Sequence, residues 1–365
     1  MLGVRTIILG GAVAAAIVVV GYSLLPSKPQ QRAWVPDPVL APAHIADDPY
    51  LTLPPQFHDA EVRQALKTAV TDAYARSDFV KLEAMAKFYR DTAARTPAGT
   101  WKLSLFYNDL SMQDEDSHPD GENSFFAAEK KDESWIAAFP KSPTPYIVNA
   151  EQLTNHGWFH RGNGYARTVS QEGWESFREY LAFAQSVLEK NKSVASSDPE
   201  CYTAMLTIAL GLSWTKDQFE PVIREGSNRF PLYYDIYRSG ARFYLPIWGG
   251  NIDDFDTFAN YAVSKTRATD GTTLYGRVYT INGFYYLFRE SHAQWPRLFN
   301  ALQGMRQLYP DPRNENKFAL YACIAEDRKW TAIMMPQIEK SPDMDIWKTK
   351  SYFEGCRNFA LGKKS

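Results

Sequence analysis

The stretch that decides the fold is residues 174–188, WESFREYLAFAQSVL. Its bulky apolar residues recur at helical spacing and fall on one face of a helix, while charged residues largely fill the other face. These apolar residues are Trp174, Phe177, Tyr180, Leu181, Ala184 and Leu188. The same spacing occurs within residues 255–263 and 295–308. Because alternating strand patterns are hard to find, we predict an all-α fold.

Helix breakers divide the second half of the chain at regular intervals. Pro199, Pro231, Gly271 and Pro312 each open a segment of about 30–40 residues that holds two helical patterns. A helix pair that recurs at this length is typical of an α-solenoid. The full tetratricopeptide consensus is absent, so we predict degenerate tetratricopeptide-like helix pairs.

The N-terminus predicts a single transmembrane helix. Residues 6–25 contain no charged side chain, and a helix of that length spans about 30 Å, the thickness of a bilayer's hydrocarbon core. A cleaved signal peptide has a shorter apolar stretch followed by small residues at the cleavage site. We therefore expect an uncleaved anchor, with a cleaved signal peptide and a buried core helix as the alternatives.

The short N-terminal head favours a cytoplasmic N-terminus. Arg5 and the amino group lie on one side of the predicted span, and Lys28 and Arg32 on the other, so the basic residues nearly balance. A head of five residues shows no sign of being a translocated domain. In a bacterium this orientation predicts a single-pass inner-membrane protein with its soluble part in the periplasm.

The rest of the chain divides into three predicted parts. Residues 26–56 contain eight prolines, which force extended geometry and predict a proline-rich linker. We expect a helical N-terminal part over residues 57–170 and the helix-pair repeats over residues 171–365. Residues 1–25 form the anchor.

Charge and cysteine content exclude several classes of protein. Forty Lys and Arg residues against 42 Asp and Glu residues argue against nucleic-acid binding by phosphate neutralisation. Three cysteines rule out a disulfide scaffold and a zinc ribbon. Cys323 and Cys356 lie about one helix pair apart, so they either face each other and oxidise outside the cytoplasm or remain buried thiols.

Two histidines have the spacing of metal ligands. His156 and His160 are four residues apart and share a helix face, but the sequence lacks the glutamate of a hydrolytic zinc motif. Gly157 and Gly162 are expected to weaken the helix that would hold them. We therefore predict no metal site and no cofactor.

Several phrases of this chain resemble a little-studied bacterial family known only as a domain of unknown function. The similarity covers about residues 130–290, and LPxWGG and LYxRxY are its most specific parts. The resemblance implies a helical, tetratricopeptide-like domain and no reaction. The matching residues are Glu172-Gly173-Trp174, Asp198-Pro199-Glu200-x-Tyr202, Leu245-Pro246-x-Trp248-Gly249-Gly250 and Leu274-Tyr275-x-Arg277-x-Tyr279.

Aromatic and arginine residues in and around these phrases are the candidate binding residues. Aromatic side chains are enriched at interaction hot spots, and the planar guanidinium of arginine suits carboxylate partners. Core packing, helix caps and ion pairs between helices are the alternative roles. The candidates are Arg161, Arg167, Tyr233, Tyr237, Trp248 and Arg277.

A stacked array of helix pairs creates a long groove that needs no catalytic residue to be useful. We therefore expect binding of another protein or peptide along the concave face, without catalysis and without nucleic acid. One alternative is an immunity protein that neutralises an antibacterial effector. A cell-envelope hydrolase is the alternative from a different class.

Overall fold

The computed structural model describes residues 39–45, 47–111, 121–281, 284 and 286–363. Within these residues the chain forms helices joined by turns, with one isolated bridge between Arg95 and Trp101 and no strand. The predicted all-α fold is confirmed. The predicted transmembrane helix, residues 6–25, lies outside the described residues. Among the residues that are described, every helix is too short or too polar to cross a bilayer.

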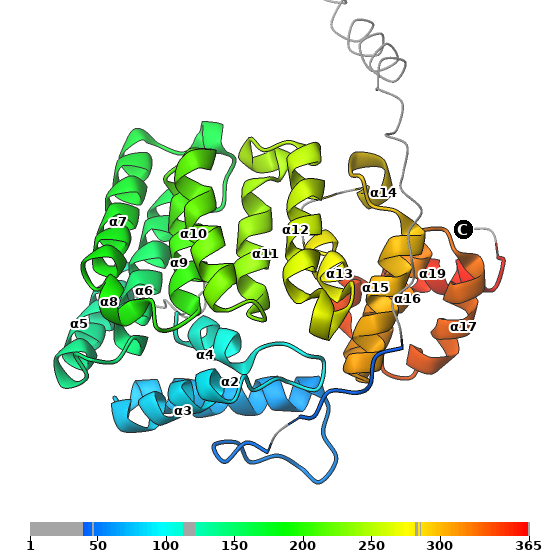
Figure 1. The fold of residues 1–365 in the computed structure, drawn as a ribbon, viewed down its shortest axis with the longest axis horizontal. Helices are drawn as coiled ribbons and strands as arrows, with labels where there is room; N and C mark the ends of the chain where they lie inside the picture. The colour runs from blue at the N-terminus through cyan, green and yellow to red at the C-terminus, as the bar shows by residue number, and fades with distance from the viewer. Residues whose placement is uncertain (1–38, 46, 112–120, 282–283, 285, 364–365) are drawn as a thin grey trace, which may run out of the picture. The chain divides into compact units, whose positions relative to one another are not determined.

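Three N-terminal helices lie together on one side of the domain (Figure 1). They are α2 (Asp59–Ala75), α3 (Phe79–Asp91) and α4 (Lys102–Leu110). Helix α2 packs against both α3 and α4. Its buried residues include Val62, Leu66 and Val70, which lie four residues apart on one face.

The next three long helices pack side by side. They are α5 (Glu122–Ala138), α6 (Thr144–Arg161) and α7 (Gln171–Lys190). Helix α7 contains the stretch that the periodicity predicts, and Phe177, Leu181, Ala184 and Leu188 are buried in it. Its first turn is capped by Ser170, whose Oγ accepts a hydrogen bond from the backbone N–H of Gly173 at 3.0 Å.

The second half of the chain is a series of helix pairs. They are α9 (Glu200–Gly211) with α10 (Lys216–Arg229), α11 (Tyr234–Phe243) with α12 (Ile252–Asp270), α13 (Thr273–Tyr279) with α15 (Trp295–Leu308), and α16 (Pro312–Ile324) with α17 (Arg328–Ile338). The last long helix is α19 (Lys350–Ala360). Shorter pieces join them, namely η2 (Ala166–Thr168), α8 (Lys192–Ala195), η3 (Pro246–Trp248), α14 (Leu287–Glu290) and α18 (Met344–Trp347).

The predicted breakers lie at helix ends. Pro199 is the N-cap of α9, and Pro312 is the first residue of α16, where its missing N–H costs no helical hydrogen bond. Gly271 ends α12 at a φ of 56°, which favours glycine. The predicted helices within residues 255–263 and 295–308 are confirmed as parts of α12 and α15.

The structure describes part of the predicted linker, and that part contacts the helices. Residues 39–56 belong to the same compact unit as the helices. The Asp48 carboxylate pairs with the buried Lys102 ammonium at 2.8 Å, and the Tyr50 ring packs against Phe88. The prolines therefore shape a strap that packs on the helices. Residues 26–38 lie outside the described residues.

The predicted division at residues 170 and 171 falls between two helices that contact each other. Helices α6 and α7 flank this point and pack extensively on each other. Residues 37–365 form one compact unit. The less regular apolar pattern before residue 170 therefore lies in the same compact unit as the helix pairs.

Cys323 and Cys356 form a disulfide, with their Cα atoms 5.8 Å apart. The bond joins α16 to α19. Of the two alternatives that the spacing left open, the structure has the disulfide. Cys201 is a free, buried thiol.

Candidate functional site

Helices from both halves of the chain line a cavity of about 810 Å³. Helices α4, α11, α13 and α16 supply most of its wall, and residues of α2, α18 and α19 complete it. This volume is in the range of pockets that bind small molecules or short peptide segments. Helices α11, α13 and α16 each come from a different helix pair, so the cavity follows the inner side of the series.

The wall of the cavity is strongly cationic. Seven of its lining residues are basic, and only Asp235 and Asp345 are acidic. The basic residues are Arg63, Arg238, Arg242, Arg277, Arg313, Lys317 and Lys348. The whole chain has a formal charge of −2, so the cavity concentrates positive charge in a nearly neutral protein.

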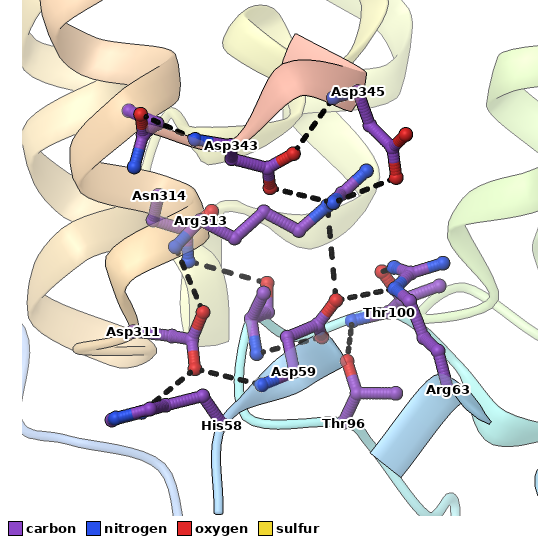
Figure 2. A network of polar contacts seen from close by, with 12 residues as sticks. His58, Asp59, Arg63, Thr96, Thr100, Asp311, Arg313, Asn314, Asp343 and Asp345 are labelled. Carbon is purple, nitrogen blue, oxygen red and sulfur yellow. Dashed lines mark hydrogen bonds and ion pairs between the residues drawn. The ribbon is translucent and has the colours of Figure 1, made fainter. Parts of the chain in front are cut away.

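A polar network at one edge of the cavity holds the two ends of the domain together. Figure 2 shows Asp59 of α2 between Arg63 and Arg313, with Asp311 close by. The backbone N–H of Asp59 donates to Asp311 Oδ2 at 3.0 Å, and Arg313 Nε lies 3.7 Å from Asp59 Oδ2. Arg63 forms an ion pair with the same carboxylate. These contacts join α2 to the start of α16.

The network continues from α16 to α18. Arg313 Nη1 lies 2.7 Å from Asp343 Oδ2 and 3.6 Å from Asp345 Oδ2. Asp343 also caps α18, since its Oδ1 accepts from the backbone N–H of Asp345. Burial raises the pKa of Asp311, and the neighbouring charge of Asp59 raises it further. Arg63 and Arg313 are therefore fixed in position by carboxylates of the chain itself.

Arg277, another cation of the cavity, has no carboxylate partner among the described residues. The guanidinium of Arg277 lies 4.3 Å from the centre of the Tyr234 ring, and its Nε and Nη2 atoms are buried without a hydrogen-bond acceptor. An unpaired buried donor is costly, because it loses water and gains no bond. These two atoms are therefore ready to bind an acceptor that enters the cavity.

Burial and the cationic surroundings in the cavity lower the pKa values of two basic residues, Lys317 and Arg242. Burial lowers the pKa of Lys317 to about 7, and the surrounding arginine charges act in the same direction. Burial also lowers the pKa of Arg242, with a second contribution from the charge of Arg238. An anion in the cavity would relieve the repulsion at both residues.

The structure separates the six predicted binding residues. Arg277 lines the cationic cavity. Arg161 and Trp248 line a second, smaller pocket of about 290 Å³. Arg167 is exposed on η2 and lines neither pocket.

Tyr233 and Tyr237, two of the predicted binding residues, are fully buried in this structure. The Tyr233 hydroxyl donates to the carboxylate of Glu200, and the Tyr237 hydroxyl donates to the carbonyl of Pro231 at 2.9 Å. A tyrosine whose hydroxyl is bonded this way belongs to the core. Both residues therefore serve the alternative role, core packing.

The smaller pocket is lined mainly by aromatic rings. Its walls contain Trp158, Trp174, Trp214 and Trp248. Trp248 packs edge-on against Trp158, with ring centres 6.1 Å apart. The LPIWGG phrase places it there, because Gly249 adopts a φ of 84° directly after the 3-10 helix η3.

The Asp198-Pro199-Glu200 phrase lies in a buried polar cluster. Asp198 pairs with Arg90 of α3 and accepts a hydrogen bond from Tyr107 at 2.8 Å. Burial raises the pKa of Glu200, and the neighbouring Glu151 raises it further. This phrase therefore joins the N-terminal helices to the first helix pair.

Most of the cavity's basic residues were missed by sequence reasoning. One signal was present, since Arg238 and Arg242 in α11 and Arg313 and Lys317 in α16 are four residues apart and share a helix face. Each pair lies in the first helix of a predicted repeat unit. No such signal marks Arg63, which only the folded chain brings to the cavity.

A separate group of titratable residues lies on α5 and α6. Glu122, His156 and His160 each bring one potential ligand atom within 4.8 Å of the others. Helix α6 runs without a break through Gly157 to Arg161. Of the two glycines expected to weaken this helix, Gly157 lies inside it and Gly162 is its C-cap.

No family model, no curated protein and no solved structure matches this chain. The resemblance of its phrases to an uncharacterised bacterial family stays a prediction.

Proposed function

We propose that this chain is a membrane-anchored binding protein that takes an acidic segment of another protein into its cationic cavity. In this proposal the helix pairs form a degenerate tetratricopeptide-like solenoid, and residues 6–25 anchor it in a bacterial inner membrane. The observation that carries the proposal is the excess of basic residues on the cavity wall, seven against two acidic ones.

The chemistry of the wall favours carboxylates as the ligand groups. Arg313 and Arg238 already bind carboxylates of the chain, at 2.7 Å from Asp343 and 2.8 Å from Asp235. The free donors of Arg277 and Lys317 leave room for carboxylates from outside. Arginine presents a planar pair of N–H donors that matches a carboxylate.

The size and the walls of the cavity favour a peptide over a simple anion. A volume of about 810 Å³ exceeds what one inorganic ion fills. Apolar and aromatic residues such as Leu274, Tyr321 and Trp347 also line it. Side chains of these types pack against the apolar parts of a peptide, while the cations bind its carboxylates.

The disulfide supports a location outside the cytoplasm. Disulfides persist in oxidising compartments such as the periplasm and are rare in the cytoplasm. The Cys323–Cys356 bond therefore agrees with the proposed orientation, in which the helical domain lies in the periplasm.

Titration of the full-length protein in detergent with hexaglutamate tests the proposal. We expect saturable binding that weakens with added salt, whereas hexaglutamine does not bind. The variant Arg277→Gln should weaken binding about 10- to 100-fold, because a hydrogen bond between charged groups contributes about 1.5–3 kcal/mol.

The matched control is Arg167→Gln, which removes an exposed arginine that does not line the cavity. We expect it to bind hexaglutamate like the wild type. Equal effects of the two substitutions, or no binding of hexaglutamate at all, would contradict the proposal.

A further inference from the structure

Two histidines and a glutamate converge where α5 meets α6. His156 and His160 lie one turn apart on α6, and Glu122 is the first residue of α5. Glu122 Oε1 lies 3.6 Å from His156 Nε2 and 3.3 Å from His160 Nε2. Two ligands of a tetrahedral zinc ion, each about 2.0–2.1 Å from the metal, lie roughly 3.3 Å apart. Glu122 Oε1 therefore lies near the zinc-ligand spacing from both nitrogens, and all three atoms lie within 4.8 Å of one another.

Both imidazole nitrogens that face this point lack a hydrogen bond. His156 is fully buried, and the Nε2 atoms of His156 and His160 are buried without a hydrogen-bond partner. Most buried polar atoms in proteins have a partner. A metal ion between the two nitrogens would supply the missing partner for both.

A second carboxylate orients His156. Its Nδ1 lies 2.7 Å from Glu129 Oε1. Nδ1–H donation to this carboxylate leaves the Nε2 lone pair free for a metal. Histidines that bind metals usually make such a bond with their other nitrogen, which fixes the ring and raises its basicity.

Close packing of α6 on α7 holds the rings in place. A side chain at Gly157 would lie 2.7 Å from Leu181 Cδ1, so glycine lets the two helices approach. The Tyr180 ring then lies against His156 with centres 3.9 Å apart, and Phe125 stacks on His156 at 4.6 Å. Gly157, which was expected to weaken α6, therefore allows α7 to pack against the histidines.

We propose that Glu122, His156 and His160 bind one divalent transition-metal ion, with zinc as the favoured metal. Imidazole and carboxylate ligands suit zinc. The three protein ligands leave a fourth position for water or another ligand, on the side of the half-exposed Glu122. The ion joins the start of α5 to the end of α6. The proposal differs from the expectation that the chain has no metal site, and it does not depend on the cationic cavity.

Zinc titration of the full-length protein, after removal of metal with a chelator, tests the proposal. A chromophoric chelator as competitor reports the affinity and the number of ions bound. We expect one tightly bound ion per chain in the wild type. Glu122→Gln and His160→Asn should each lose at least about tenfold in affinity, and Glu129→Gln should lose about 10- to 100-fold without removing a ligand.

His292→Asn is the matched control. His292 pairs with Asp253 at 2.6 Å, and neither residue belongs to the proposed site. Metal-free variants are first compared with the metal-free wild type by thermal melting. Zinc should raise the melting temperature of the wild type and of His292→Asn, because it binds only the folded chain. It should leave the melting temperature of Glu122→Gln almost unchanged.

The zinc measurements either support the proposed site or overturn it. Loss of binding in Glu122→Gln and His160→Asn, with binding retained in His292→Asn, supports the site. Wild-type protein that binds no zinc, or binding that both ligand substitutions leave unchanged, overturns it.

Discussion

Lys317 connects the charge of the cavity to pH. Its pKa of about 7 means that the ammonium group loses its proton within the physiological range. An anionic ligand raises this pKa by offsetting the burial and the surrounding positive charges. Below pH 7 the ligand meets a charged lysine, whereas above pH 7 binding must also take up a proton. Affinity for an acidic ligand therefore falls as pH rises through about 7.

Substitution of Lys317 tests this coupling. We expect wild-type affinity for hexaglutamate to fall several-fold between pH 6 and pH 8.5, a range in which the peptide itself stays ionised. Lys317→Gln should bind more weakly at pH 6 and show a flatter pH profile. Isothermal titration at several pH values measures both, with the exposed Lys190→Gln as control. An unchanged pH profile in Lys317→Gln would contradict the role of this lysine.

Single residues were only partly predictable. Arg277 was identified because it lies in the LYxRxY phrase, and it does line the cavity. The burial of Tyr233 could not be foreseen, because sequence alone does not distinguish an exposed tyrosine from a buried one whose hydroxyl has a partner. The proposed metal site could not be grouped from the sequence, because Glu122 lies 34 residues before His156 and no local motif joins them.

At the scale of elements, the disulfide fixes the last long helix. Cys356 of α19 is bonded to Cys323 of α16, and the bond limits the freedom of the unfolded chain over the loop between them. We expect the double variant Cys323→Ser with Cys356→Ser to be less stable by about 2–4 kcal/mol. Hydrogen exchange should become faster in α19, because the helix then depends on packing alone.

Denaturant unfolding and hydrogen exchange of the full-length protein measure these effects. A reducing agent should destabilise the wild type and leave the double variant unchanged. Cys201→Ser is the control for loss of a buried thiol, and it should keep its sensitivity to the reducing agent. If α19 exchanges equally fast with and without the disulfide, the structural role of the bond is refuted.

Helices were the most predictable elements, and their packing was less so. The periodicity of residues 174–188 is local, so it reports α7 without knowledge of the rest of the chain. The prolines of residues 39–56 correctly indicate an absence of regular structure. They do not reveal the pairing of Asp48 with Lys102, which comes from residues 54 positions apart.

At the scale of the whole molecule, polar contacts join α2 to α16, which lie far apart in the sequence. Figure 2 shows α2 joined to α16 through Asp59 and Arg313, residues more than 250 positions apart in the sequence. This junction lies at one edge of the half-open cavity, where Arg63 and Arg313 contribute to the wall. Sequence periodicity predicts repeats but does not predict that α2 packs near α16, more than 200 residues further along the chain.

The most direct test of the central claim is to find where an acidic peptide lies on the protein. Full-length protein in detergent is irradiated with hexaglutamate that carries a photoreactive group, and the adducts are mapped by mass spectrometry. The account predicts adducts on lining residues of α11, α13 and α16, such as Tyr234, Leu274 and Leu320, and fewer adducts in Arg277→Gln. Adducts confined to α10 and α12, or a yield unaffected by that substitution, would contradict it.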